Sequence, residues 1–348
     1  MQPVLGTTID ANTAATKRVA AFDLIRVFAA FSVIVVHVAT PVVRSNAPDT
    51  LLWWSGNVYE ALFRSGVPLF LMLSGALLLP KATGLTFIKN RVLRVFFPFA
   101  FWTLVFIVAR HKLADITFAD YSIGLLKGAT GYFWYVYLII GIYSCMPLLR
   151  IILQKSGLTA SGAILLICLT SIGWYGVQLL APAAETVLRY IIYVEYVVLG
   201  YLLTTVKEHD WLGKRTVSLL FIVIGFIGTL AGAYCYAVTV GTEGELFYES
   251  VGLQIIFRSI GIWFIAFRVI RYFSASVIKV ITRLSKFTFA VFLMHPLVID
   301  HILVARMGIS LNFEVPVIGI PIAAVLCFCM ASAMAYLLGK LPLGKFTY

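Results

Sequence analysis

The chain has 348 residues, of which 61% are hydrophobic and only 12% are charged, and its mean hydropathy is +0.98. Soluble domains carry about 25% charged residues, so this composition excludes a soluble globular protein and indicates an integral membrane protein. The net charge of +12 does not indicate a nucleic-acid partner, because the basic residues gather in alternate connections between apolar segments.

The N-terminal residues are polar and precede the first apolar segment. Residues 1–16 lack the basic start and the small-residue cleavage site of a signal peptide, so we expect the first span to be retained. We interpret residues 1–18 as a short cytoplasmic N-terminal segment and residues 19–348 as a single membrane domain.

Apolar stretches of about twenty residues, each long enough to cross a hydrocarbon core of about 30 Å, recur along the rest of the chain. The sequence predicts spans at residues 20–40, 61–80, 95–110, 132–149, 160–180, 187–206, 216–239, 251–270, 286–304 and 315–338. These stretches lack the alternating pattern of a membrane barrel. The expected fold class is therefore all-α, a polytopic helical bundle with about ten transmembrane helices.

Lysines and arginines set the expected topology. They are concentrated on the side that includes both ends of the chain, so the positive-inside rule predicts that both termini are cytoplasmic. The longest connections are expected to be outer loops near residues 41–60 and 111–131.

The first span carries ionisable residues on one stripe. At about 100° per residue, Asp23, Arg26 and His37 share a helix face, with Arg26 and His37 roughly 16 Å apart along the axis. Charges inside a membrane are costly and should face a partner or a cavity. Asp23 and Arg26 are interpreted either as an ion pair near the inner end of the span or as site residues. His37 can take and return a proton near neutral pH.

Basic residues open the third predicted span. Arg91 and Arg94 lie one helical turn apart, with Lys89 nearby. Paired guanidinium groups bind phosphate through bidentate hydrogen bonds, although ordinary positive-inside anchoring would place basic residues here as well. Arg64, at the outer end of the second span, is a candidate contact to an acceptor molecule or to a lipid phosphate.

Other polar residues recur in later spans. His295 precedes Pro296, which restrains the backbone, and is interpreted either as a site residue or as a hydrogen-bonded interior histidine. Arg189, Glu195 and Arg258 are further intramembrane charges. Glu195 cannot easily reach the membrane surface, so it is expected to be paired or to line a cavity.

No metal site is predicted. The histidines form no i, i+4 pair with a general-base glutamate, and the five cysteines form no Cys-x-x-Cys pattern. The cysteines are interpreted as small packing residues.

Motifs along the whole chain carry a family resemblance. Arg26 and His37 are separated by ten residues, "RSGVPLFLMLSGALLL" follows, Arg91 and Arg94 come next, and "FWYVYLIIGIYSCMPLL" and "LSKFTFAVFLMHPLV" lie further along. In order and spacing, the chain resembles acyltransferase family 3, the integral-membrane acyltransferases. Its compact length and the end "HPLVIDHILVARMGISLNFEVP" look most like the enzymes that O-acetylate bacterial surface polysaccharides such as enterobacterial common antigen.

The resemblance implies a multi-pass protein of the bacterial inner (cytoplasmic) membrane that moves acetyl from cytoplasmic acetyl-CoA to a hydroxyl of a cell-surface glycan or its lipid-linked precursor. The family's arginine and histidine correspond to Arg26 and His37, and its paired arginines to Arg91 and Arg94. Ala76 departs from the tyrosine that the family commonly has at this point.

The expected mechanism uses these residues in sequence. Arg91, Arg94 and Lys89 bind the CoA phosphates, and Arg26 lines the passage or binds part of the cofactor. His37 acts as general base in direct transfer to the glycan hydroxyl. A covalent acetyl-histidine is the alternative.

The remaining expectations concern partners. Arg64, Glu195 and His295 are the candidate acceptor-binding residues. Acetyl-CoA is expected as co-substrate without a metal, and the expected partners are a glycan or lipid-linked glycan and membrane lipids, with no nucleic acid. The sequence leaves the oligomeric state open. The alternative function is a transporter or flippase for a lipid-linked sugar or a small acidic solute, which would use the same buried charges for binding and relay.

Overall fold

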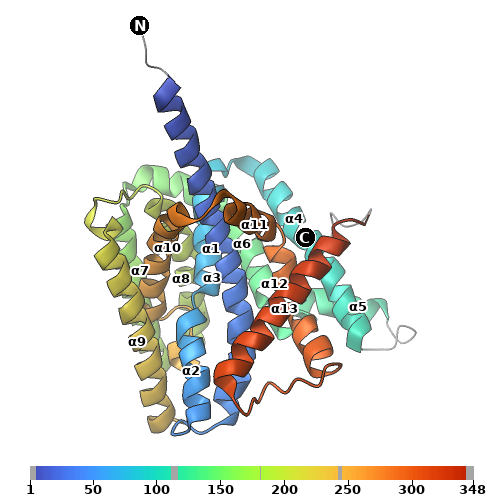
Figure 1. The fold of residues 1–348 in the computed structure, drawn as a ribbon. Coiled ribbons are helices and arrows are strands. Elements are labelled where there is room, and N and C mark those ends of the chain that lie inside the picture. Colours follow the sequence, from blue (N-terminus) through green and yellow to red (C-terminus); the bar gives the residue numbers. More distant parts are fainter. Residues whose placement is uncertain (1–4, 111–116, 181, 242–244, 342–348) are drawn as a thin grey trace.

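The computed structural model describes residues 5–110, 117–180, 182–241 and 245–341. Regular structure within these ranges is helical, and the long helices run side by side as a bundle (Figure 1). The α-helices are α1 (Leu5–Ser45), α2 (Leu51–Phe63), α3 (Gly66–Leu78), α4 (Gly84–Arg110), α5 (Phe118–Lys127), α6 (Trp134–Ser156), α7 (Ala160–Leu180), α8 (Pro182–Leu203), α9 (Arg215–Thr239), α10 (Leu253–Val269), α11 (Ala275–Ser285), α12 (Thr288–Leu297) and α13 (Pro316–Leu338). Short 3-10 helices are η1 (Leu79–Lys81), η3 (Gly131–Phe133), η4 (Trp211–Gly213), η5 (Glu245–Tyr248) and η6 (Ile270–Tyr272), and η7 (Val298–Val304) is a π-helical segment.

The helices are long and apolar enough for a membrane bundle. The described part of the chain has nine helices that meet the length and hydropathy needed to cross a membrane, or ten if the pair α11 and α12–η7, bent by 61°, counts as one span. The predicted all-α polytopic bundle is therefore confirmed, and each predicted span falls on one of these segments.

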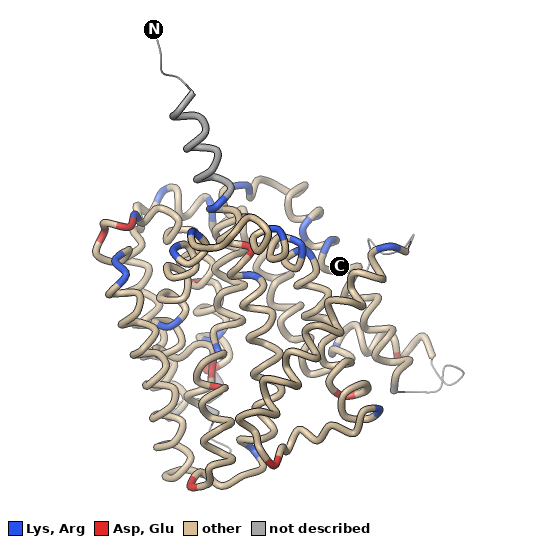
Figure 2. The backbone as a smooth tube through the Cα atoms, in the orientation of Figure 1, with Lys and Arg blue, Asp and Glu red and all other residues tan. Residues whose placement is uncertain are grey.

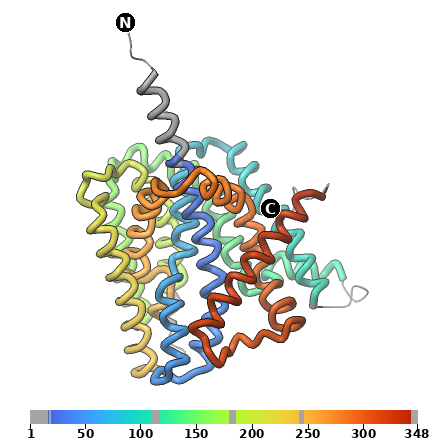
Figure 3. Tube along the Cα trace, in the orientation of Figure 1, coloured from blue at the N-terminus to red at the C-terminus, as the bar shows by residue number. Residues whose placement is uncertain are grey.

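Helix α1 lies at the centre of the bundle and organises it. It packs against α2, α3, α10, α11, α12 and α13, and α13 crosses it obliquely (Figure 3). The alanines Ala29, Ala30 and Ala39 are buried along α1, and such small side chains let neighbouring helices approach closely. Side chains on these neighbouring helices can therefore contact Arg26 and His37.

The expected outer loop at residues 41–60 is wrong. Helix α1 continues to Ser45 and α2 begins at Leu51, where the Thr50 hydroxyl accepts a hydrogen bond from the backbone N–H of Trp53 and caps the helix. Burial explains the difference, because Trp53 packs into a cluster with residues of α9 and η5. The apolar side chains of this connection therefore fold as helix against the bundle.

The second expected outer loop, at residues 111–131, is also partly helical. Helix α5 begins with a capping box between Thr117 and Asp120 and packs on α4. Residues 111–116 lie outside the described residues.

Helices α3 and α8 approach each other unusually closely. A Cβ atom on Gly75 would collide with the backbone carbonyl of Val197, and one on Gly200 would collide with the backbone of Met72. The two glycines therefore allow backbone-to-backbone contact.

Basic side chains mark one end of the bundle. Lysines and arginines gather at the end where α1 begins and where α11 lies across the helix ends, and the described C-terminal residues also lie toward it (Figure 2). The positive-inside rule predicts that this end faces the cytoplasm.

Candidate active site

A cavity of about 700 Å³ lies between the N-terminal half of α4 and the C-terminal end of α11, the helix that lies across the basic end of the bundle. Helices α1, α3, α4, α6 and α12 and the end of α11 form its walls. Its lining residues are Arg26, Phe70, Leu73, Ser74, Leu77, Leu78, Asn90, Arg91, Leu93, Arg94, Val95, Phe97, Pro98, Tyr135, Ile139, Tyr143, Ser285, Lys286, Thr288, Phe289 and Phe292. The wall thus combines cationic groups with aromatic and aliphatic surface.

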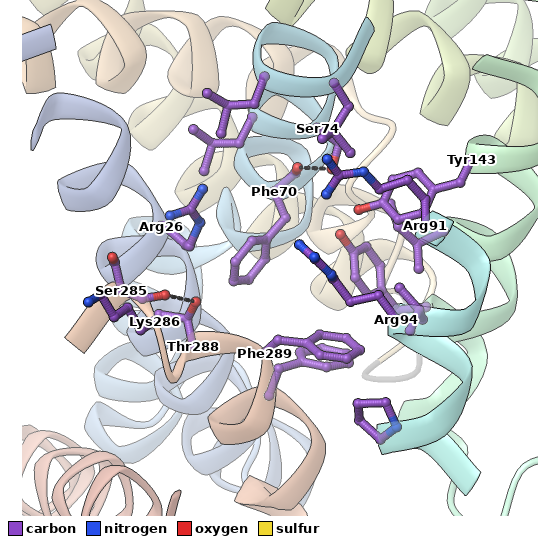
Figure 4. Close-up of a pocket in the computed structure, with 18 of the residues that line it drawn as sticks. Arg26, Phe70, Ser74, Arg91, Arg94, Tyr143, Ser285, Lys286, Thr288 and Phe289 are labelled. Carbon is purple, nitrogen blue, oxygen red and sulfur yellow. Dashed lines mark hydrogen bonds between the residues drawn. The ribbon is translucent and has the colours of Figure 1, made fainter. Parts of the chain in front are cut away.

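Three of the predicted arginines meet at this cavity. Arg26 approaches it from α1, and Arg91 and Arg94 approach from α4 on the opposite side (Figure 4). Lys286, which directly follows α11, adds a fourth positive charge. Guanidinium groups that converge from two helices can clamp phosphate oxygens.

Lys89 is not part of this arrangement. Its side chain is exposed on α4, and Asn90 takes a place in the cavity wall instead. The sequence correctly indicated basic residues at the start of α4. Successive residues of a helix differ in direction by about 100°, so Lys89 does not share the face of α4 that meets the cavity.

The predicted ion pair at the inner end of α1 is present. Nη1 of Arg26 lies 2.9 Å from Oδ1 of Asp23, and the same oxygen accepts a hydrogen bond of 2.8 Å from the Ser285 hydroxyl. Asp23 thereby fixes Arg26 and joins α1 to the end of α11. Arg26 is thus both paired and part of the cavity wall, and its role as a site residue stays a prediction.

Aromatic rings form the deep end of the cavity. Tyr135 and Phe292 are buried with ring centroids 5.1 Å apart, and Phe70 lies 6.3 Å from Tyr135. Phe292 also borders the next polar layer of the bundle, with its ring centroid 5.8 Å from that of His295.

That next layer is a pair of histidines. Nδ1 of His37 lies 2.9 Å from Nε2 of His295, and the rings stack with centroids 5.0 Å apart at an angle of 13°. Nδ1 of His295 lies 2.6 Å from the carbonyl oxygen of Phe292, the residue that lines the cavity. His295, predicted as either a site residue or an interior histidine, is fully buried and directly contacts His37. The two residues are 258 positions apart, so no spacing signal could have joined them.

Tyr132, which no sequence pattern singled out, completes this layer. Its ring, from η3, lies 4.4 Å from that of His37 in an edge-on contact and 5.6 Å from that of His295. The aromatic run after the loop was visible in the sequence, but which of its rings faces α1 depends on the tertiary structure.

Arg64 lies outside the cavity and is held by α2. Its Nε lies 2.5 Å from Oε2 of Glu60, a fully buried carboxylate that also accepts a 2.5 Å hydrogen bond from Thr40. Glu60 was not recognised from the sequence, where it sits in the segment expected to be a loop.

The other intramembrane charges form separate groups. Glu195 accepts a 2.9 Å hydrogen bond from Thr170 of α7 and does not line the cavity. Arg189 is paired with Glu185 and Glu249. The structure therefore does not bring Glu195 together with the histidine pair, and its acceptor role stays a prediction. Among the described residues no cluster of three or more His, Cys, Asp or Glu is placed to hold a metal ion.

The fold and the site describe a polytopic membrane protein with a cationic cavity next to a pair of contacting histidines. Over residues 19–338, the chain matches the family Acyl_transf_3, described as an acyltransferase domain. It belongs to this family and is a membrane acyltransferase. No curated protein and no solved structure matches the chain.

Proposed function

We propose that the protein is an O-acyltransferase of the bacterial cytoplasmic membrane that moves acetyl from cytoplasmic acetyl-CoA to a hydroxyl group of a cell-surface glycan or its lipid-linked precursor. The observation that carries this proposal is the layered site. An arginine-lined cavity at the basic end of the bundle reaches Phe292, and the Phe292 carbonyl contacts the histidine pair.

The cavity suits the donor. Arg26, Arg91 and Arg94 would bind the phosphates of CoA through charge-assisted hydrogen bonds. The pantetheine arm would then follow the apolar wall toward Tyr135 and Phe292. Arg26 and His37 are roughly 16 Å apart along α1, which is about half of the hydrocarbon thickness, so the thioester can approach the histidine pair from the cytoplasmic side.

The chemistry is direct acyl transfer. His37 would remove the proton of the acceptor hydroxyl while its oxygen attacks the thioester carbonyl, forming the new C–O bond. Collapse of the tetrahedral intermediate breaks the C–S bond, and the thiolate of CoA takes the proton back from His37. Direct transfer is preferred over an acetyl-histidine because a deprotonated glycan hydroxyl is itself a competent nucleophile.

The acceptor would arrive from the opposite end of the bundle, where Tyr132 borders His37. The resemblance of the C-terminal part of the sequence to enzymes of the enterobacterial common antigen type supports a surface polysaccharide as the acceptor class. Of the predicted acceptor contacts, His295 lies beside His37, whereas Arg64 is bound to Glu60 of α2.

Donor binding tests the proposal first. Titration of acetyl-CoA into the protein in nanodiscs should give saturable binding that free CoA competes away. Arg91→Ala/Arg94→Ala should weaken this binding by at least about 100-fold, because two hydrogen bonds between charged groups are lost. Lys89→Ala is the matched control, since Lys89 lies on the same helix but outside the cavity, and it should bind within about threefold of wild type.

The outcomes separate the alternatives. Full acetyl transfer to a lipid-linked glycan by His37→Ala would remove the histidine from the chemistry. A folded wild type that binds neither acetyl-CoA nor CoA would overturn the donor assignment and favour the transporter or flippase interpretation, because a carrier does not need to recognise CoA.

A further inference from the structure

The hydrogen bonds around His295 fix which of its nitrogens carries a proton. A backbone carbonyl can only accept, so Nδ1 of His295, 2.6 Å from the Phe292 oxygen, must be the donor. A neutral imidazole has one N–H, and a fully buried ring next to a second imidazole is expected to stay neutral. Nε2 of His295 therefore carries no proton and can only accept a hydrogen bond.

The same logic continues to His37. Its Nδ1, 2.9 Å from Nε2 of His295, must be the donor of that hydrogen bond. In neutral His37 the other ring nitrogen, Nε2, then holds a free electron pair. His37 is partly accessible whereas His295 is fully buried, so the free base belongs to the ring that a substrate can reach.

The sequence His295-Pro296 explains why the Phe292 carbonyl is available. In an α-helix, the N–H of residue 296 would bond to the carbonyl of residue 292. Pro296 has no N–H, so this carbonyl loses its usual donor. The His295 side chain supplies a donor in its place. A proline that interrupts α12 is thus what orients the imidazole.

We propose that His295 is a positioning residue that holds His37 as its Nδ1–H tautomer and so makes Nε2 of His37 the general base. The inference rests on the proposed function, in which His37 deprotonates the acceptor hydroxyl. When His37 becomes protonated, the same bond to His295 disperses the new positive charge, which an isolated buried imidazole could not do.

Nitrogen NMR tests the tautomer without any substrate. The chain has five histidines, so ¹⁵N-histidine labelling gives few signals, and the spectra of His37→Asn and His295→Gln assign the two that matter. In wild type, both His37 and His295 should carry the proton on Nδ1. Exposed His209 serves as the internal reference. A wild-type His37 with its proton on Nε2 would overturn the inference.

Two substitutions at position 295 extend the test. The Gln amide in His295→Gln can donate to the Phe292 carbonyl and accept from His37, so the His37 tautomer should persist. His295→Leu fills the space without an acceptor, so His37 should shift toward the Nε2–H form. The turnover number kcat should fall roughly 10²- to 10⁴-fold in the Leu variant, the range for loss of a positioned base, and much less in the Gln variant.

The donor side separates this inference from the proposed function. Acetyl-CoA affinity should stay within about threefold of wild type in both variants, because His295 is not part of the cavity wall. Normal donor binding and acetyl transfer by His295→Leu, with an unchanged His37 tautomer, would refute the positioning role and leave the proposed function intact. If the wild-type protein does not bind acetyl-CoA, that result counts against the proposed function instead.

Discussion

Among individual residues, Glu60 carries the clearest consequence for stability. It is fully buried and neutralises Arg64 across a 2.5 Å contact. Glu60→Gln leaves the Arg64 cation without its carboxylate in a low-dielectric environment, so we expect a destabilisation of about 3–5 kcal/mol. The measurement is the thermal or denaturant unfolding of the purified protein. Glu60→Gln/Arg64→Met removes both charges and should recover part of the loss.

An exposed Glu–Arg pair provides the control for this prediction. Glu208 and Arg271 also contact each other, but their side chains are 54% and 51% exposed. Exposed pairs contribute only about 0–1 kcal/mol, so Glu208→Gln should unfold almost as wild type does. Equal losses for the two variants would mean that burial of the Glu60 carboxylate is not what makes its pair important.

Phe292 is expected to limit the length of the acyl group. Its side chain lines the deep end of the cavity and lies edge-on to Tyr135 at 5.1 Å. Phe292→Ala removes this barrier but keeps the backbone carbonyl that His295 needs. The ratio of kcat/KM for butyryl-CoA to that for acetyl-CoA should rise by about tenfold or more, since one or two methylenes are worth that much in an apolar pocket.

Phe289 is the matched control on the same helix. It also lines the cavity, one helical turn nearer the basic end. Phe289→Ala should leave the ratio of the two acyl donors close to that of wild type. If both variants change chain-length preference equally, the deep aromatic layer is not the selective element.

At the level of elements, the α3–α8 contact should tolerate no added side chain. Gly75 faces the backbone of Val197, and Gly200 faces that of Met72. Gly200→Ala must push the two helices apart, and overpacking of this kind costs about 1–3 kcal/mol. Unfolding measurements on Gly200→Ala and on Gly141→Ala test this. An added Cβ at Gly141 meets no atom within 4 Å, so that variant should be neutral or slightly more stable.

How elements face one another also explains what the sequence could and could not predict. Hydropathy located the spans, and helical periodicity correctly placed Asp23, Arg26 and the Arg91–Arg94 pair, because those relations lie within one helix. The contact of His37 with His295 is a relation between α1 and α12, and one-dimensional spacing carries no information about it.

The errors have the same origin. The segment at residues 41–60 was expected to be an outer loop between two predicted spans, but Trp53 and its neighbours have a partner surface on α9 that makes a helix favourable. Lys89 was grouped with the arginines by proximity in sequence, whereas the face of α4 that meets the cavity carries Asn90.

For the whole molecule, the decisive feature is that polar residues of the site lie at two different depths in the helical bundle. The arginine-lined cavity lies at the basic end, and the histidine pair lies further along α1, beyond the aromatic layer of Tyr135 and Phe292. In the proposed function, a water-soluble donor and a glycan acceptor would therefore meet at His37 from opposite sides of the membrane. Neither has to cross the hydrocarbon core.

The proposed function predicts that donor access is one-sided. In proteoliposomes of known orientation, acetyl-CoA should support transfer only when it is on the side of the basic end. The arginine-lined cavity lies at that end, and CoA does not cross a bilayer unaided. Orientation is reported in a cysteine-free background by Lys279→Cys, on α11 at the basic end, and Asn312→Cys, in the exposed segment before α13 at the other end. An impermeant maleimide should label one of these two cysteines in each orientation.

If acetyl-CoA added on the Asn312 side drives transfer in sealed vesicles as well as acetyl-CoA on the Lys279 side does, then the donor does not enter through the arginine cavity. The arginines would then serve topology alone.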